Sequence, residues 1–225
     1  MREKVIISLG GSLIVPDKID LNFLKSFEKI IRNFVNKYDF IITTGGGSVA
    51  RNYINAVKEL VKTSSDDEDW LGISATKINA QFVKTIFKDI ANPKVFNNPA
   101  EKIGDYKITV ASGYKPGCST DNIAVNLAIN NGIKKIINLT NTSHIYDKDP
   151  KKHKDAKKFE EIKWDDYIKI VGNEWKAGLS SPFDPIASKG AKEHDLKVII
   201  ADGKDLDNFV NILSNKNFVG TTISN

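Results

Sequence analysis

The chain has 225 residues, of which 40% are hydrophobic and 27% are charged, a composition typical of soluble globular proteins. Its single cysteine, Cys118, excludes an internal disulfide and a zinc site built from cysteines. The net charge of +5 suits an anionic ligand. The lysines and arginines are scattered, however, and form no basic block interleaved with aromatic residues, which disfavours nucleic-acid binding.

The sequence shows no sign of secretion or of membrane insertion. The apolar run Val5–Leu9 is too short for a signal peptide, and no apolar run reaches the length of a membrane span. His144, His153 and His194 are isolated in the sequence, which disfavours a metal cluster or a histidine-based catalytic triad. We therefore predict a cytoplasmic protein in which residues 1–225 form a single domain.

Strands and helices are expected to alternate along the chain. Apolar, β-branched runs predict strands over residues 4–9, 40–44, 106–111, 134–140, 196–201 and 220–223. Apolar residues at helical spacing predict helices over residues 23–35, 49–61, 70–90, 123–128, 164–171, 186–194 and 206–213. Residues 92–105 should be irregular, and the charged segment 146–158 and the polar segment 172–185 should be loops. This alternation predicts a three-layer α/β/α sandwich whose mainly parallel sheet is covered on both faces.

The stretch 40–51 (FIITTGGGSVAR) joins a buried strand to a helix through three glycines. Such a junction leaves backbone N–H groups free at the positive end of the helix dipole, where phosphate commonly binds. Arg51 follows in the first turns of that helix, where its guanidinium can hold a second phosphate edge. A plain strand–helix turn with a surface arginine is the alternative explanation of the same pattern.

Two further junctions have the same form. Residues 10–12 (GGS) follow the first strand, and residues 113–121 connect the third strand to a helix. Each also has a purely structural explanation, namely a β-turn in the first case and helix capping by Ser119 or Thr120 in the second. Asp69 stands just before the next apolar helical pattern, either as its N-cap or as a carboxylate that accepts from a sugar hydroxyl.

Taken together, the three junctions indicate phosphoryl transfer. In a parallel sheet they would lie along the carboxyl edge, where two phosphorylated ligands can meet. No catalytic base is evident, and none is needed if the acceptor is a phosphate or carboxylate, because transfer then depends on positioning, charge neutralisation and Mg²⁺. The sequence has no Walker A motif, and the loose dinucleotide fingerprint at 45–50 lies on the second strand instead of the first, which disfavours dinucleotide binding.

Short motifs recur from Ile6 to Ile223 in an order typical of one family. They are GGS at 10–12, GGGSVAR at 45–51, DWLGI at 69–73, AT at 75–76, NA at 79–80, PGCSTD at 116–121, DP at 149–150, DAK at 155–157, DP at 184–185 and GT at 220–221. Through these motifs the chain resembles the amino acid kinase superfamily, and within it the archaeal-type uridylate (UMP) kinases. The resemblance covers essentially the whole chain.

The resemblance implies transfer of the γ-phosphate of ATP to UMP, with Mg²⁺ bound through the nucleotide phosphates and with no metal ligand among the side chains. It also implies assembly into homo-oligomers, which in this family are hexamers. The implied catalytic residues are Gly10, Gly11 and Arg51. The implied ATP-side residues are Gly10, Gly11, Ser12, Gly46, Arg51, Thr140, Asn141, Tyr146 and Asp149. The implied UMP-side residues are Gly45, Asp69, Tyr114, Lys115, Pro116, Gly117, Cys118, Ser119 and Thr120.

Three positions depart from the family pattern. Ser8 stands where most of the superfamily has a lysine. Archaeal-type enzymes often lack that lysine too, so Ser8 agrees with the resemblance to them. The catalytic cation is left open among Lys115, Lys151 and Lys152. Residues 141–146 (NTSHIY) replace the family's Asn-Val-Asp-Gly-Val-Tyr, which changes the ATP-side loop. Lys77 replaces an arginine, so that the charge is kept but the bidentate fork is lost.

Two other functions are compatible with the sequence. One is a kinase of the same superfamily with another acceptor, such as isopentenyl phosphate or a small carboxylate. The other is a non-catalytic protein that binds a nucleotide or an oxyanion on this fold, an interpretation that only the altered segment 141–146 favours. Nucleotide binding without phosphoryl transfer would identify the second.

Overall fold

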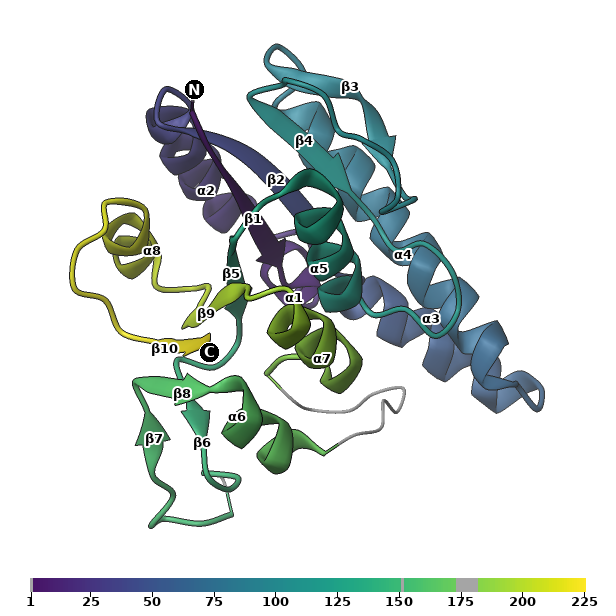
Figure 1. Cartoon of the computed structure of the whole chain (residues 1–225). Coiled ribbons are helices and arrows are strands. Elements are labelled where there is room, and N and C mark those ends of the chain that lie inside the picture. The colour runs from purple at the N-terminus through teal and green to yellow at the C-terminus, as the bar shows by residue number, and fades with distance from the viewer. Residues whose placement is uncertain (1, 151, 173–181) are drawn as a thin grey trace.

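The computed structural model describes residues 2–150, 152–172 and 182–225. Eight strands form the central sheet in the spatial order β3-β4-β2-β1-β5-β9-β10-β8, and β6 and β7 form a separate pair (Figure 1). The six strands from β3 to β9 in this order run parallel, whereas β10 runs antiparallel to β9. The strands are β1 Glu3–Leu9, β2 Tyr38–Thr44, β3 Ala91–Phe96, β4 Ile108–Ala111, β5 Lys135–Thr140, β6 Ile145–Tyr146, β7 Lys158–Phe159, β8 Glu161–Lys163, β9 Lys197–Asp202 and β10 Thr221–Ser224.

Both faces of the central strands are buried. In β1, Val5 and Ile7 pack into the core on one face of the sheet and Ile6 packs into the core on the other. All seven residues of β2 are buried. Continuous burial of this kind is what a parallel sheet between two helical layers requires, and the predicted three-layer α/β/α sandwich is confirmed.

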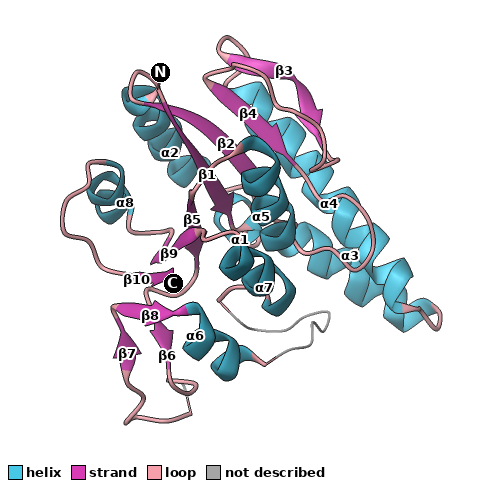
Figure 2. Cartoon of the chain, viewed as in Figure 1, coloured by secondary structure: helices cyan, strands magenta, loops and turns pink. Residues whose placement is uncertain are grey.

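Helices cover the sheet on both sides (Figure 2). On one face lie α2, α4 and α8, where Phe27 of α2 stacks on Phe209 of α8 with ring centroids 5.9 Å apart. On the other lie α5, α6 and α7, around the buried side chains of Trp164 and Tyr167. None of the helices in the described part of the chain is both long and apolar enough to cross a membrane. The helices are α1 Gly11–Ile14, α2 Leu21–Phe34, α3 Gly47–Leu60, α4 Ser65–Ile86, α5 Thr120–Asn131, α6 Trp164–Val171, α7 Pro185–Glu193 and α8 Leu206–Leu213.

The expectation of irregular structure was wrong for the first part of residues 92–105, whereas the described residues of the expected loop 146–158 form strand at its two ends alone. Part of residues 92–105 belongs to β3, which tolerates Pro93 because it is an edge strand that pairs only with β4. The expected surface loop 146–158 has paired ends, because Tyr146 of β6 lies opposite Lys158 of β7. Most of the expected loop 172–185 lies outside the described residues.

Val49 of α3 packs against the core while remaining partly buried, but much of the apolar surface of this helix lies outside the core. Ser48 is its one buried residue, whereas Tyr53 is 65% and Leu60 80% exposed. The neighbouring α4 likewise exposes Trp70 and Ile78. The spacing therefore predicted the helix correctly, but a large part of its apolar surface is left uncovered in the single chain.

Candidate active site

Five parallel strands, β1, β2, β4, β5 and β9, end at the same edge of the sheet. The chain continues from β1 to β2 on one side and from β5 to β9 on the other, so the direction of the connections reverses between β1 and β5. Open parallel sheets bind ligands at such a reversal. Gly10 lies there, and its N–H donates to the carbonyl oxygen of Leu139 over 3.0 Å. The three predicted junctions follow β1, β2 and β4 and therefore share this edge.

The first two glycine loops pack backbone against backbone. A Cβ on Gly11 would lie 2.1 Å from the nitrogen of Gly47, and one on Gly45 would lie 2.5 Å from the nitrogen of Gly11. Gly47 also has a φ of +64°, which favours glycine. The two loops therefore form one unit in which a side chain at either position would push the backbones apart.

This unit presents free backbone donors. The N–H groups of Gly11, Ser12, Gly46 and Gly47 donate to no acceptor within the described residues. Gly46 is in the right-handed and Gly47 in the left-handed region, a succession that forms anion-binding nests, and the pair opens a helix of 14 residues. The observed arrangement is a candidate site for the phosphates of a ligand.

Arg51 lies on α3, one turn beyond these donors. Its side chain is exposed, and Nη2 donates to the carbonyl oxygen of Pro16 over 3.3 Å. It forms no salt bridge with any residue that the structure describes, so its charge is not compensated by a neighbouring carboxylate.

Asp69 does not cap the helix that follows it. The N-cap of α4 is Ser64, which forms a capping box with Asp67, and Asp69 lies within the first turns of the helix. The N-cap interpretation was wrong because α4 begins inside the acidic segment, where carboxylates favour a helix N-terminus. Asp69 instead accepts a hydrogen bond from the N–H of Gly117 over 2.8 Å, which links it to the third junction.

The third junction is anchored at both ends. At its start, Gly113 donates its N–H to Oγ1 of Thr76 over 2.8 Å, and at its end Ser119 caps α5 by accepting from the N–H of Asn122. The expectation that Ser119 has a capping role is thus confirmed. Between them Gly117 has a φ of +75°, and Lys115 lies over the ring of Tyr114 at 5.8 Å. Pro116, Cys118 and Thr120, the remaining residues predicted for the UMP side, belong to the same segment. Burial raises the pKa of the Cys118 thiol.

The carboxyl groups of Asp121 and Asp184 lie beneath this edge, and the sequence did not predict them as part of the site. Ser8 of β1 donates to one oxygen of Asp121, and the N–H of Asp184 donates to the other, each over 3.2 Å. Burial and the nearby Asp184 carboxylate raise the pKa of Asp121 to about 7. Burial also raises the pKa of Asp184. Both aspartates stood in recognised motifs, directly after Thr120 and before Pro185, which is the signal that could have found them.

The predicted ATP-side residues follow β5. Thr140 ends that strand and Asn141 is the next residue, whereas Tyr146 and Asp149 lie in and after β6. The altered segment 141–146 is held in place, because Thr221 accepts a hydrogen bond from the N–H of Ile145 over 2.9 Å. Of the candidate cations, Lys152 lies 4.0 Å from the Asp149 carboxylate, and Lys151 is outside the described residues.

A loop that the sequence did not single out joins this side. Gly203 and Lys204 follow β9, which ends at Asp202, and the N–H of Gly203 donates to the carbonyl oxygen of Thr140 over 2.8 Å. Asp202 accepts from the N–H of Lys204 over 2.9 Å, which shapes the turn. Lys204 is thereby placed at the carboxyl edge, beside the predicted ATP-side residues.

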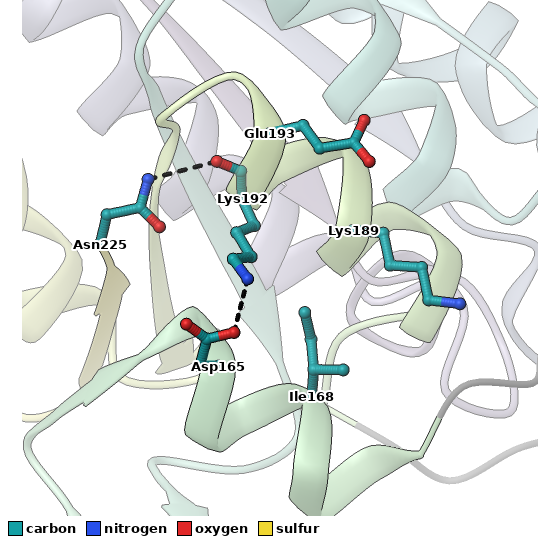
Figure 3. A pocket seen from close by; sticks show the side chains of 6 residues that line it. All are labelled: Asp165, Ile168, Lys189, Lys192, Glu193 and Asn225. Atoms are coloured by element: carbon teal, nitrogen blue, oxygen red, sulfur yellow. Dashed lines mark hydrogen bonds and ion pairs between the residues drawn. The ribbon is translucent and has the colours of Figure 1, made fainter.

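A surface pocket of about 490 Å³ lies elsewhere, between α6 and α7 (Figure 3). Asn225, which lines it, follows β10, and because β10 runs antiparallel to β9 its last residues lie toward the amino ends of the parallel strands. In this pocket Lys192 is paired with Asp165. The pocket is therefore distinct from the edge that carries the glycine loops.

Comparison with known proteins agrees with this arrangement. The model of the amino acid kinase family matches residues 3–202. The chain belongs to the amino acid kinase family. It is 37% identical to a uridylate kinase of Thermoplasma volcanium, over 99% of this chain and 98% of the relative, and 33% identical to one of Methanobrevibacter smithii, over 98% of both.

Solved structures of similar proteins show the same fold. The uridylate kinase of Archaeoglobus fulgidus superposes with a TM-score of 0.83 at 29% identity, covering 98% of this chain and all of that one. The UMP kinase of Ureaplasma parvum superposes with a TM-score of 0.80 at 18% identity, covering both chains fully, and supports the fold alone. The predicted membership of the family and its predicted fold are both confirmed.

Proposed function

We propose that the protein transfers the γ-phosphate of ATP to UMP, which gives UDP and ADP. The observation that carries the proposal is the junction of two glycine loops that present four free N–H groups beside an acceptor loop tied to Asp69. The names of the archaeal relatives support UMP as the acceptor.

In this proposal the free N–H groups of Gly11, Ser12, Gly46 and Gly47 bind the transferring phosphates, with Gly10 and Gly45 shaping the loops. Arg51 neutralises phosphate charge from the edge of the site. The donor nucleotide lies over the ends of β5 and β9, along Thr140, Asn141, Tyr146 and Asp149. The acceptor lies between α4 and the segment from Tyr114 to Thr120, with its ribose at Asp69. Because the acceptor phosphate is already an anion, no side chain has to remove a proton.

Magnesium enters the proposal through the nucleotide. Mg²⁺ usually keeps several waters and is held largely by substrate phosphates, so the phosphates of the bound nucleotide would hold it here. The ion would neutralise charge that develops on the phosphoryl group. The amide donors and Arg51 complete that neutralisation from the protein.

We further propose that the protein acts in the cytoplasm as one domain and as a homo-oligomer, a hexamer by resemblance to the family. The uncovered apolar side chains of α3 and α4 support the assembly, namely Tyr53, Leu60, Trp70 and Ile78. The molar mass in solution, measured by light scattering at several concentrations, tests this part.

The acceptor is tested by measuring ADP formation from ATP and Mg²⁺ with UMP, CMP, dUMP, acetylglutamate, aspartate and isopentenyl phosphate in turn. We expect turnover with UMP, reduced about 100-fold or more in Arg51→Ala because a phosphate contact is lost. Lys62→Ala, which removes an exposed charge just beyond the far end of α3, is the matched control and should retain wild-type activity. Turnover only with another acceptor would contradict the proposal that UMP is the substrate. Nucleotide binding without turnover would contradict the proposal that the protein is an enzyme.

A further inference from the structure

We propose that Asn79 is a positioning residue that aims two backbone N–H groups of the phosphate-binding unit toward the ligand. Asn79 lies on α4, and its side chain is buried, with 4% of its surface exposed. Its Nδ2 donates to the carbonyl oxygen of Gly45 over 2.8 Å and to that of Gly46 over 3.2 Å. Both partners can only accept, so the orientation of the amide follows from its neighbours.

The consequence for the N–H groups comes from the geometry of the peptide bond. The carbonyl of Gly45 belongs to the same peptide plane as the N–H of Gly46, and the carbonyl of Gly46 to the same plane as the N–H of Gly47. In a trans peptide the C=O and N–H bonds point in opposite directions, and the described chain contains no cis peptide. A donor that holds both carbonyls on the α4 side therefore turns both N–H groups away from α4.

Those two N–H groups are the free donors of the second glycine loop. The carbonyl oxygen of Gly46 also accepts from the N–H of Ala50 over 3.3 Å. Without Asn79 this longer bond would be left to hold Gly46, and because glycine has wide conformational freedom, a flip of either peptide would replace an N–H by a carbonyl oxygen that repels phosphate. Asn79 thus sets the sign of the local electrostatic field without contacting the ligand. The Asn-Ala motif at 79–80, which the site residues otherwise leave without a role, acquires one.

The same helix also orients the acceptor side. One turn before Asn79, Thr76 accepts from the N–H of Gly113, and its carbonyl oxygen accepts from the Thr44 hydroxyl at the end of β2. Farther toward the N-terminus, Asp69 holds Gly117. α4 therefore contacts the phosphate loop and the acceptor loop with successive turns of one rigid element.

The test is the isosteric variant Asn79→Asp, in which a carboxylate replaces the donor and faces two carbonyl oxygens. Asn92→Asp is the matched control, because Asn92 is also buried and also bonds a backbone carbonyl, that of Ile103, but lies at the start of β3, at the opposite edge of the sheet. Asn79→Ala serves as a second variant if the carboxylate prevents folding. The measurements are kcat and KM with ATP and UMP, ADP binding by calorimetry, and the thermal unfolding midpoint.

For both Asn79 variants we expect kcat to fall about 100-fold, as for the loss of a backbone donor that stabilises developing charge, and ADP binding to weaken at least tenfold. The control should lose stability with kcat and ADP affinity within threefold of the wild type. Equal changes in kcat for Asn79→Asp and Asn92→Asp, or unchanged ADP affinity in Asn79→Ala, would overturn the inference. The inference rests on the proposed function, but ADP binding separates the two, since a wild type that binds ADP without phosphorylating UMP contradicts only the function.

Discussion

Replacement of Gly11 by alanine tests the interlocked glycine loops. The added Cβ would lie 2.1 Å from the nitrogen of Gly47 and 2.5 Å from the carbonyl carbon of Gly45, both of them backbone atoms that cannot rotate away. To restore contact distances the two loops must separate by about 1 Å, and overpacking of this kind destabilises a protein by about 1–3 kcal/mol. A displacement of about 1 Å among groups that position a reaction lowers the rate about 100-fold. We therefore expect Gly11→Ala to lose about 100-fold in kcat, and about 2–10 °C in unfolding temperature.

Steady-state phosphorylation of UMP and differential scanning calorimetry provide these two numbers. Gly72→Ala is the matched control, since the nearest atom to its new Cβ is a side-chain atom of Ile54 at 4.0 Å and the site lies within α4. Alanine there should be neutral or stabilising by about 0.5–1 kcal/mol, because glycine is a poor helix former. Retention of at least one third of the wild-type kcat in Gly11→Ala would refute the argument that the loops act as one closely packed unit.

Three further changes test other parts of the structure. Asp69→Ala removes the acceptor of the Gly117 N–H, and we expect the KM for UMP to rise about tenfold or more while the KM for ATP stays within threefold, in initial-rate assays. Because the pKa of Asp121 is raised to about 7 in the folded state, its contribution to stability is complete below about pH 4 and is lost as the pH rises through 7. The stability of Asp121→Asn, measured by unfolding in urea, should therefore depend less steeply on pH between about 4 and 7, and an unaltered slope would contradict the assignment. Phe27→Ala should lower the free energy of unfolding by about 3–5 kcal/mol, because it empties the buried stack on Phe209, and a loss below 1 kcal/mol would show that the α2–α8 layer repacks.

Periodicity was sufficient for the elements that bury one face. The helix at 164–171 and the helix at 206–213 were predicted with the bounds that α6 and α8 have, since their apolar residues pack where the spacing implies. Periodicity failed where the neighbouring elements decide whether a segment forms a strand or which of its residues are buried. β3 contains a proline and few apolar residues, and it is a strand only because β4 offers it an edge. The apolar pattern of α3 predicted a helix but not that Tyr53 and Leu60 are exposed.

The site was predictable to the extent that its residues are consecutive. The glycine junctions at 10–12, 45–47 and 113–121 follow strands, so a parallel sheet brings them to one edge. Contacts between distant residues could not be predicted in this way. The bond from Ser8 to Asp121 spans more than a hundred residues, and the bonds from Asn79 to Gly45 and Gly46 depend on how α4 packs beside β2. Such contacts are set by tertiary packing and have no local signal in the sequence.

Direct transfer of labelled phosphate tests whether the protein phosphorylates UMP. The protein would be incubated with γ-³²P-ATP, Mg²⁺ and UMP, and the products separated by thin-layer chromatography. We predict that the label appears in UDP, at a rate that Gly11→Ala lowers about 100-fold and Gly72→Ala leaves unchanged. Label that remains in ATP, or that appears only as inorganic phosphate while nucleotide binding is intact, would contradict this prediction.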